Sequence, residues 1–357
     1  MKNEHGGNVS EVSRRCGIDE DKIIDFSANI NPLGYPAGVK AAVMTGFDAI
    51  LNYPDTDAFD LITKLAAYHD IDRKHIIAGN GSTEFIYWIP IIFKPKRALV
   101  VTPAFSEYEK ALKLAGTQVI YFQADRGDFV VDIDNLCTCL EEGFDILYFC
   151  NPANPTGILT PKEELIRLIA RAERLGTIVI IDEAFIDFVE EASVKTEINR
   201  SPHLIVLRSM TKFFGIPGLR VGYAIASIPV AERLRKNKPP WMINTIAQIC
   251  ACDALSDSAF ICETRRYVET EKGFLHRTIN SIPGLKAFPS VANYLLVRID
   301  SRKGLSSKDL RERLLREDIL IRDCSNFQRM GNHYFRVAVK KHEENRLLIN
   351  KLKGVMA

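Results

Sequence analysis

Five motifs in the first two thirds of the chain bring together residue types that could do chemistry as a group. They are GNGSTE (79–84), TPAFSEY (102–108), NPANPTG (151–157), DEAF (182–185) and RSMTKFFGIPGLRVG (208–222). Between them they supply hydroxyl groups, an aromatic ring, an amide, a carboxylate, an amine and a guanidinium group. Each has a simpler explanation on its own, because a lysine is usually a solvated surface residue and an aspartate after a strand often caps the next helix. Their joint order indicates a common site.

One ligand, pyridoxal phosphate, needs this whole set. It requires an amine to form an imine, an acid to keep its pyridine nitrogen protonated, a ring to stack on, a donor to its phenolic oxygen and a cup for its phosphate. The sequence predicts Lys212 as the amine, Asp182 as the acid, Phe105 as the ring, Asn154 as the donor, and Ser82, Thr83, Ser209 and Arg220 as the cup. N–H groups at a helix start suit a phosphate, and arginine binds it through parallel hydrogen bonds. The protonated ring serves as an electron sink for a carbanion at an amino acid's α-carbon. The sequence predicts no metal-binding residues.

Short apolar runs rich in Val, Ile and Leu must position these groups. The predicted strands are 98–101, 118–122, 146–150, 177–181, 204–207 and 221–226. Helical patterns lie between them, and the clearest begins with a capping box at Thr160, Pro161 and Glu163 and ends at Gly176. Strands that alternate with helices predict an α/β fold with a mostly parallel sheet covered on both faces. In such sheets ligands bind outside the carboxyl ends of the strands, where the motifs fall.

The last third of the chain predicts a smaller α+β domain. Its strands are expected at 293–299, 319–321 and 334–339, and its helices at 307–317 and 342–353. Arg322 and Arg336 end or interrupt two of the apolar runs, so each could be a solvent-facing strand residue. Alternatively, both face a cleft between the domains and clamp a phosphate and a carboxylate. The expected organisation is an N-terminal arm (1–35) that packs with the small domain, a large domain (36–255) and the small domain (256–357), linked by a helix near 258–279.

Length and composition exclude several classes of protein. The chain has 357 residues, a length that predicts two domains or one large one. Hydrophobic residues make up 46% and the formal net charge is +2, so we expect neither a nucleic-acid nor a membrane partner. The longest apolar stretch is too short to span a bilayer. The first residues lack the apolar stretch of a secretory signal, and the eight cysteines show no disulfide or zinc-finger spacing. These features are typical of a cytoplasmic protein with reduced thiols.

Several motifs together carry a family resemblance over nearly the whole length. NPxNPTG, DEAF, S-x-T-K followed by GxxGxRxG, and YFRVAV (334–339) resemble the fold-type-I pyridoxal-phosphate enzymes of the aspartate-aminotransferase superfamily, near the histidinol-phosphate aminotransferases. HGGN (5–8), DFSANINPLG (25–34), NYPD (52–55) and ANYLLVR (292–298) are similar to the branch that decarboxylates threonine phosphate in cobalamin biosynthesis. The resemblance implies conversion of L-threonine O-3-phosphate to (R)-1-amino-2-propanol O-2-phosphate and CO2.

The resemblance also implies roles for individual residues. Lys212 matches the Schiff-base lysine, Asp182 the partner of the ring nitrogen, and Arg336 the arginine that binds the substrate carboxylate. The positions that match those holding the phosphorylated substrate are His5, Gly6, Asn29 and Arg322. Asn154 matches an asparagine that reaches the cofactor's phenolic oxygen and lines the substrate pocket. Tyr53 matches a tyrosine that reaches the cofactor phosphate of the neighbouring subunit, which implies a homodimer. Without the resemblance, His5 would be expected to lie in a disordered terminus.

The sequence is also compatible with functions other than decarboxylation of threonine phosphate. Many transaminases carry DEAY, in which the tyrosine hydroxyl binds the cofactor's phenolic oxygen, whereas this chain has Phe185. The decarboxylase branch shares the phenylalanine, so Phe185 favours decarboxylation over the main rival, histidinol-phosphate transamination. A phosphoserine-preferring decarboxylase differs by one substrate methyl group, which is worth only about 1–3 kcal/mol in a pocket. A regulator that has lost catalysis would be expected to carry a DNA-binding module, and the sequence shows no basic segment typical of one. A nicotinamide dehydrogenase would need a G-x-G-x-x-G motif after its first strand, and the sequence has no such motif there.

Overall fold

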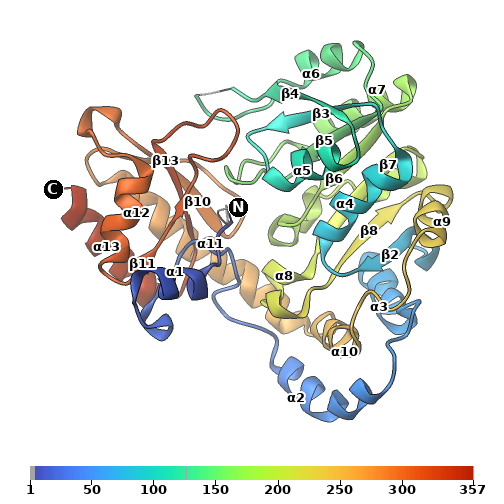
Figure 1. Cartoon of the computed structure of the whole chain (residues 1–357), viewed down its shortest axis with the longest axis horizontal. Helices are drawn as coiled ribbons and strands as arrows, with labels where there is room; N and C mark the ends of the chain where they lie inside the picture. Colours follow the sequence, from blue (N-terminus) through green and yellow to red (C-terminus); the bar gives the residue numbers. More distant parts are fainter. Residues whose placement is uncertain (1–4, 126, 357) are drawn as a thin grey trace.

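A seven-stranded sheet forms the larger part of the computed structural model, which describes residues 5–125 and 127–356 (Figure 1). Its strand order is β2-β8-β7-β6-β5-β3-β4. The strands are β2 (Ile76–Gly79), β3 (Arg97–Thr102), β4 (Gln118–Gln123), β5 (Ile146–Cys150), β6 (Ile178–Asp182), β7 (Leu204–Ser209) and β8 (Gly222–Ala226). All neighbours pair in parallel except β8, which is antiparallel to both β2 and β7. The mostly parallel sheet predicted from the alternating pattern is therefore confirmed.

Helices cover both faces of this sheet because successive strand residues point to opposite sides. Alternate residues of the central strands, such as Val179 and Ile181, join a core with α2 (Ala37–Gly46), α3 (Phe59–His69), α6 (Ile133–Leu140), α7 (Lys162–Leu175) and α10 (Thr245–Ala254). The residues between them, such as Ile180, join a second core with α4 (Ser82–Phe93), α5 (Ser106–Leu114) and α9 (Ile228–Lys236).

The start of α7 differs from the prediction in detail. The helix ends at Gly176, which takes a left-handed conformation, as expected. At its start, however, Pro161 is the N-cap residue and no side chain caps the helix. The backbone N–H of Thr160 donates to Oδ1 of Asn151 at 2.8 Å, and the Asn151 amide donates back to the Thr160 carbonyl at 3.1 Å. The predicted capping box was therefore wrong. The backbone of Thr160 is held by Asn151, directly after β5, and Thr160 does not cap the helix.

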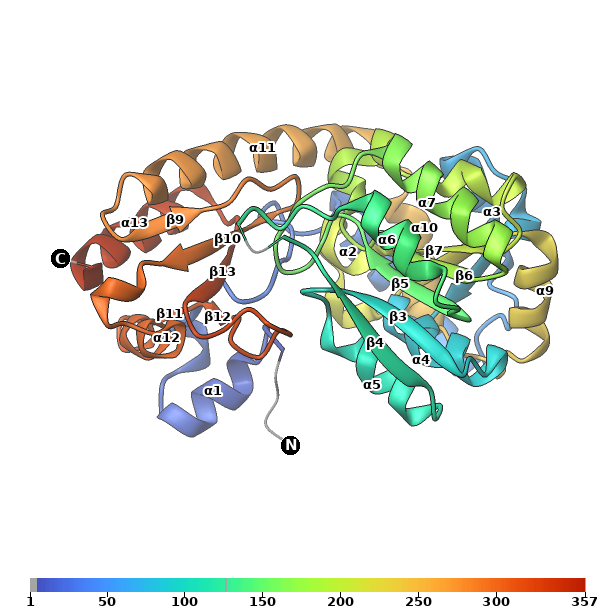
Figure 2. The same ribbon diagram turned by 90° about the horizontal axis from the view of Figure 1, so that it is seen from above.

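A smaller four-stranded antiparallel sheet has the order β12-β13-β10-β9 (Figure 2). Its core packs against the helix α11, which extends from the large sheet's helices along the small sheet. The N-terminal segment adds to this part, because β1 pairs in parallel with β11 and Phe26 is buried in the same core. The elements are α1 (Val9–Cys16), β1 (Ile24–Asp25), α11 (Ser258–Asn280), β9 (Leu285–Ala287), β10 (Tyr294–Ile299), α12 (Ser307–Leu315), β11 (Ile319–Leu320), β12 (Arg322–Asp323), β13 (Tyr334–Ala338) and α13 (His342–Met356).

Short helices complete the described chain. They are α8 (Met210–Phe213) and the 3-10 helices Glu20–Lys22, Phe47–Leu51, Arg73–His75, Ile186–Ala192, Lys195–Asn199, Pro217–Leu219 and Ser301–Lys303. Among the described residues no single helix has the length and apolar character needed to cross a membrane. Only α10 and α11 taken together meet that test, and they meet at a bend of 77°.

Candidate functional site

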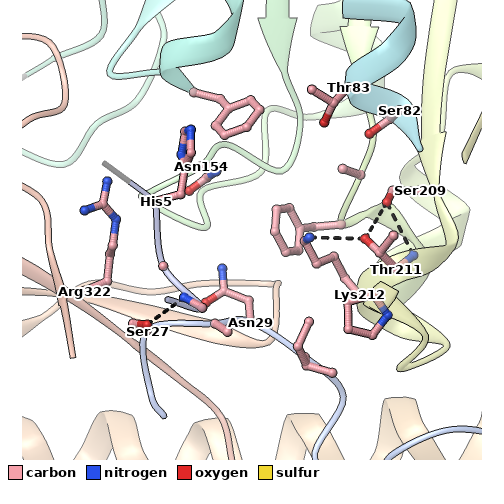
Figure 3. Close-up of a pocket in the computed structure, with 18 of the residues that line it drawn as sticks. His5, Ser27, Asn29, Ser82, Thr83, Asn154, Ser209, Thr211, Lys212 and Arg322 are labelled. Atoms are coloured by element: carbon pink, nitrogen blue, oxygen red, sulfur yellow. Dashed lines mark hydrogen bonds between the residues drawn. The ribbon is translucent and has the colours of Figure 1, made fainter. Parts of the chain in front are cut away.

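A cavity of about 510 Å³ lies at the carboxyl ends of the large sheet's strands, with the small sheet and the N-terminal arm on its other side (Figure 3). All the predicted site residues except Tyr53 line it. They are His5, Gly6, Asn29, Ser82, Thr83, Phe105, Asn154, Asp182, Ser209, Lys212, Arg220, Arg322 and Arg336. Figure 3 shows Ser82, Thr83 and Ser209 on one side and His5, Asn154 and Arg322 on the other.

Lys212 stands on the one-turn helix α8, directly after β7. Its Nζ points into the cavity and donates to Oγ1 of Thr211 at 3.1 Å. Asn31 of the N-terminal arm fixes α8, because its backbone N–H donates to the carbonyl of Lys212 at 3.1 Å and its amide to that of Phe213. Burial, with the positive charges of Arg220 and Arg336, lowers the pKa of Lys212 to about 8, against a weaker opposing effect of Asp182. The structure therefore favours a partly neutral, nucleophilic amine.

Asp182 ends β6 and is 4% exposed. Its Oδ2 accepts a hydrogen bond from the Tyr108 hydroxyl at 2.6 Å, and its Oδ1 accepts one from the backbone N–H of Ala184 at 3.0 Å. Burial raises the pKa of Asp182, whereas these two donors and the charge of Lys212 lower it. Phe105 also lines the cavity, at the start of α5, and offers an aromatic face.

The first turn of α4 and the segment before β8 form a close-packed cradle. No side chain caps α4, so its first N–H groups can bind an anion. A Cβ atom on Gly81, which has φ +82°, would lie 2.6 Å from Nη2 of Arg220. A Cβ atom on Gly222 would lie 2.3 Å from the backbone nitrogen of Ser82. A side chain at either point would collide with these groups, so the glycines let the start of α4 and the Arg220 guanidinium group lie close together at the cavity.

Arg322 and Arg336 stand directly opposite each other on the neighbouring strands β12 and β13. Arg336 is 6% exposed and donates to Oδ1 of Asn154 and, at 3.1 Å, to the carbonyl of Ser27. With its amide oxygen turned toward Arg336, Asn29 accepts from it at 3.1 Å. Burial lowers the pKa of Arg322 to about 10. Like charges directly opposite each other in a sheet repel, so an anionic ligand bound beside both arginines would relieve this repulsion.

The N-terminal arm crosses the cavity and touches the large sheet's helices. Nε2 of His5 lies 2.8 Å from Oε1 of Glu107 on α5, and the His5 ring lies 5.3 Å from that of Phe105. Lys110 and Tyr87 also donate to Glu107. Burial works against the charge of Glu107, but the hydrogen bonds from Tyr87, Lys110 and His5 lower its pKa overall. His5 is therefore held in the cavity wall by an ionised carboxylate.

Some residues of the cavity were not found by sequence reasoning, and Tyr53 lies outside it. Ser27, Tyr108 and Thr211 take part through the contacts above, yet all three stand inside motifs that were singled out for other members. Their signal was proximity in the chain. The partners of Tyr108 and of the Ser27 carbonyl lie far away in sequence, whereas Thr211 contacts its neighbours Ser209 and Lys212. Tyr53 is 79% exposed and its ring stacks on that of Trp241 at 4.6 Å.

These residues fit pyridoxal phosphate. The cradle offers close backbone N–H groups and a guanidinium group, and an amine and a buried carboxylate face the same cavity. The volume exceeds that of the ring and phosphate alone, which leaves room for an amino acid beside the two arginines.

The lowered pKa of Lys212 predicts how its amine reacts with pH. A lysine with pKa 10.5 is about 0.1% neutral at pH 7.5, whereas one with pKa about 8 is roughly a quarter neutral. Because only the neutral amine attacks an aldehyde, the rate at which apoprotein reacts with pyridoxal phosphate should rise with pH and level off above about 8. Stopped-flow absorbance measures this rate, with Lys212→Ala as the control for surface lysines. A rate that keeps rising through pH 10 would contradict the assignment.

Comparisons with known proteins agree with this geometry. The family model described as aminotransferase class I and II matches residues 21–352. The threonine-phosphate decarboxylase of Salmonella typhimurium is 40% identical over 355 residues, covering 99% of this chain and 96% of that protein.

Solved structures show the same likeness. The histidinol-phosphate aminotransferase of Clostridium acetobutylicum has a TM-score of 0.87 at 32% identity, covering 93% of this chain and 98% of that one. The L-threonine-O-3-phosphate decarboxylase of Porphyromonas gingivalis has a TM-score of 0.82 at 26% identity, with the same coverage. A family model that matches nearly the whole chain, with relatives aligned end to end, places this protein in the class I and II aminotransferase family.

Proposed function

We propose that this chain is a pyridoxal-phosphate-dependent decarboxylase that converts L-threonine O-3-phosphate to (R)-1-amino-2-propanol O-2-phosphate and CO2 in cobalamin biosynthesis. One observation carries the proposal: the cavity has a phosphate cradle on one side and two opposed arginines on the other, with Lys212 pointing into it. The 40% identity to a threonine-phosphate decarboxylase agrees with it. A cytoplasmic location is part of the proposal, and the eight unpaired cysteines support it.

The cofactor is pyridoxal 5′-phosphate, on which the family depends. When bound, it attaches to amino groups through its aldehyde and withdraws electrons from the α-carbon of the attached amino acid. In the proposed arrangement Ser82, Thr83, Ser209 and Arg220 hold its phosphate. Asp182 would pair with its ring nitrogen, and Phe105 would offer an aromatic face to its ring.

The two arginines decide which bond of the substrate breaks. Arg336 binds the carboxylate and Arg322, with His5, binds the phosphate, so the α-carbon is held between two anchored anions. By anchoring the carboxylate and the phosphate, the two arginines would fix which bond at the α-carbon is presented for cleavage. A carboxylate whose bond to the α-carbon is so presented would leave as CO2. Nζ of Lys212 then returns a proton to the α-carbon, a role that suits an amine with pKa about 8.

Phe185 favours decarboxylation over histidinol-phosphate transamination. It is 4% exposed, lines the cavity and packs edge-on against Tyr294 at 5.0 Å. A phenylalanine has no hydroxyl to donate to the phenolic oxygen of the cofactor, the contact that the tyrosine of many transaminases would make. Transamination remains the second candidate because a histidinol-phosphate aminotransferase shares the fold at 32% identity.

We also propose that the enzyme is a homodimer with shared sites, in which Tyr53 reaches the partner's cofactor phosphate. Many exposed large apolar side chains of the described residues fall in one stretch of chain. They are Tyr35, Met44, Phe47, Ile50, Leu51, Tyr53 and Phe59, and Trp241 stacks on Tyr53. Exposed apolar residues gathered in this way are typical of a protein interface.

A product assay tests the proposed reaction. Holoenzyme with L-threonine O-3-phosphate should release CO2 and the amino-alcohol phosphate without an added oxo acid. L-serine O-phosphate, assayed in parallel, measures the value of the methyl group. Glutamate formation from histidinol phosphate and 2-oxoglutarate, without CO2 release from phosphothreonine, would instead establish the transaminase.

Arg322→Ala should weaken phosphorylated ligands selectively. Loss of one partner of a buried charge pair costs about 2–5 kcal/mol, so Kd for L-threonine O-3-phosphate should rise at least about 30-fold. Kd for L-threonine should change by less than about threefold, because it lacks the phosphate. Spectral titration of the holoenzyme measures both, with Arg298→Ala on β10 of the same sheet as an exposed control. Equal losses for both ligands would refute the phosphate role.

Mixing two inactive variants tests the shared site. Lys212→Ala and Tyr53→Ala are each expected to lose activity, but a mixed dimer has one site with neither change. Random reassortment makes about half of the dimers mixed, so activity should recover to about one quarter of the parent value. Recovery absent from a mixture that sedimentation shows to be reassorted would exclude the shared site.

A further inference from the structure

Tyr108 makes a direct hydrogen bond to Asp182. Its hydroxyl donates to Oδ2 of Asp182 at 2.6 Å, and the two residues are 1% and 4% exposed. The remaining oxygen, Oδ1, accepts from the backbone of Ala184. The carboxylate is therefore held from both oxygens while it still lines the cavity.

Packing fixes the position of this hydroxyl. The Tyr108 ring stacks on Tyr148 with centroids 5.2 Å apart, and it meets Phe105 edge-on at 5.8 Å. Phe105 is the N-cap residue of α5, and Tyr108 stands in the first turn of that helix. The helix that offers the stacking ring thus also places the donor on Asp182.

The surroundings of this bond favour a neutral phenol, and the phenol in turn opposes protonation of the buried carboxylate. Burial, the charge of Asp182 and the neighbouring Cys150 raise the pKa of Tyr108, so the phenol keeps its proton and donates. Burial also raises the pKa of Cys150, which stays a thiol. Burial alone would push Asp182 toward its protonated form, and the Tyr108 hydroxyl opposes this most strongly. A protonated Asp182 would have no negative charge to offer a protonated ring nitrogen.

We propose that Tyr108 is a positioning residue that holds Asp182 as a fixed, charged counter-ion for the ring nitrogen of the bound cofactor. The proposal rests on the cofactor assignment made above. Without the hydroxyl, Asp182 competes more strongly for the proton, which moves from the ring nitrogen toward the carboxylate. The ring then withdraws electrons less effectively. Tyr108 thus sets the electronic state of the cofactor without touching the substrate.

The neighbouring Tyr148 offers a matched control. Tyr108→Phe and Tyr148→Phe each remove one hydroxyl from a fully buried ring of the same stacked pair. The Tyr148 hydroxyl donates to the carbonyl of Ile86 at 3.2 Å and not to Asp182. A general effect of losing a buried hydroxyl would appear in both variants, whereas an effect through Asp182 would appear in Tyr108→Phe alone.

Two measurements on these variants do not depend on turnover. NMR of the holoenzyme with ¹⁵N-labelled pyridoxal phosphate reports the protonation of the ring nitrogen, and equilibrium dialysis of apoprotein gives Kd for the cofactor. For Tyr108→Phe we expect the ring nitrogen to shift toward its unprotonated signal and Kd to rise about 10- to 100-fold. Tyr148→Phe should keep the parent signal and a Kd within about threefold.

The possible outcomes separate this proposal from the cofactor assignment. An unchanged ring-nitrogen signal in Tyr108→Phe, or the same shift in both variants, would overturn the role of Tyr108. A parent protein that binds no pyridoxal phosphate would overturn the assignment itself. If Tyr108→Phe fails to fold, site-specific 3-fluorotyrosine at position 108 keeps the shape and strengthens the donor. It should then shift the signal toward the protonated form, and no shift would refute the proposal.

Discussion

A buried carboxylate and a buried amine that face one cavity are the constraint on which the rest of the structure depends. Asp182 ends β6, and Lys212 follows the adjacent parallel strand β7. Removing either charge from water costs free energy. Burial therefore raises the pKa of Asp182 and lowers the pKa of Lys212, and both shifts favour the neutral form. A ligand that carries a protonated ring nitrogen and an aldehyde compensates both costs at once. The order of the strands therefore brings Asp182 and Lys212 to the same edge of the sheet.

The groups that could bind anions lie on two opposite sides of the cavity. The cradle at the start of α4 lies on the large sheet's side, and the opposed Arg322 and Arg336 lie on the small sheet's side. The N-terminal arm connects the two parts, because β1 pairs with β11 while His5 reaches Glu107 on α5. In the proposed function, substrate binding therefore depends on how the small sheet and the arm sit against the large sheet.

Much of this could be predicted because the signals are local. Apolar runs and the polar motifs after them predicted the six strands of the large sheet after β2 and the cavity residues on its side, whereas His5, Gly6 and Asn29 came only from the family resemblance. The errors arose where long-range contacts decide. Thr160 is claimed by Asn151 in place of a helix cap, and the segment after α12 divides into β11 and β12, which join different sheets. The contact between Tyr108 and Asp182 spans 74 positions, and no local pattern encodes it. Tyr53 lies outside the cavity, and its proposed role depends on a partner chain that a single sequence does not describe.

The central claim is that Lys212 is the amine that carries the cofactor opposite Asp182. Borohydride reduction of the holoenzyme makes the bond between cofactor and lysine permanent, and peptide mapping by mass spectrometry then locates it. The account predicts the cofactor mass on the peptide that contains Lys212 and on no other lysine peptide in stoichiometric amount. A stoichiometric label on a different lysine, with Lys212 unmodified, would contradict it.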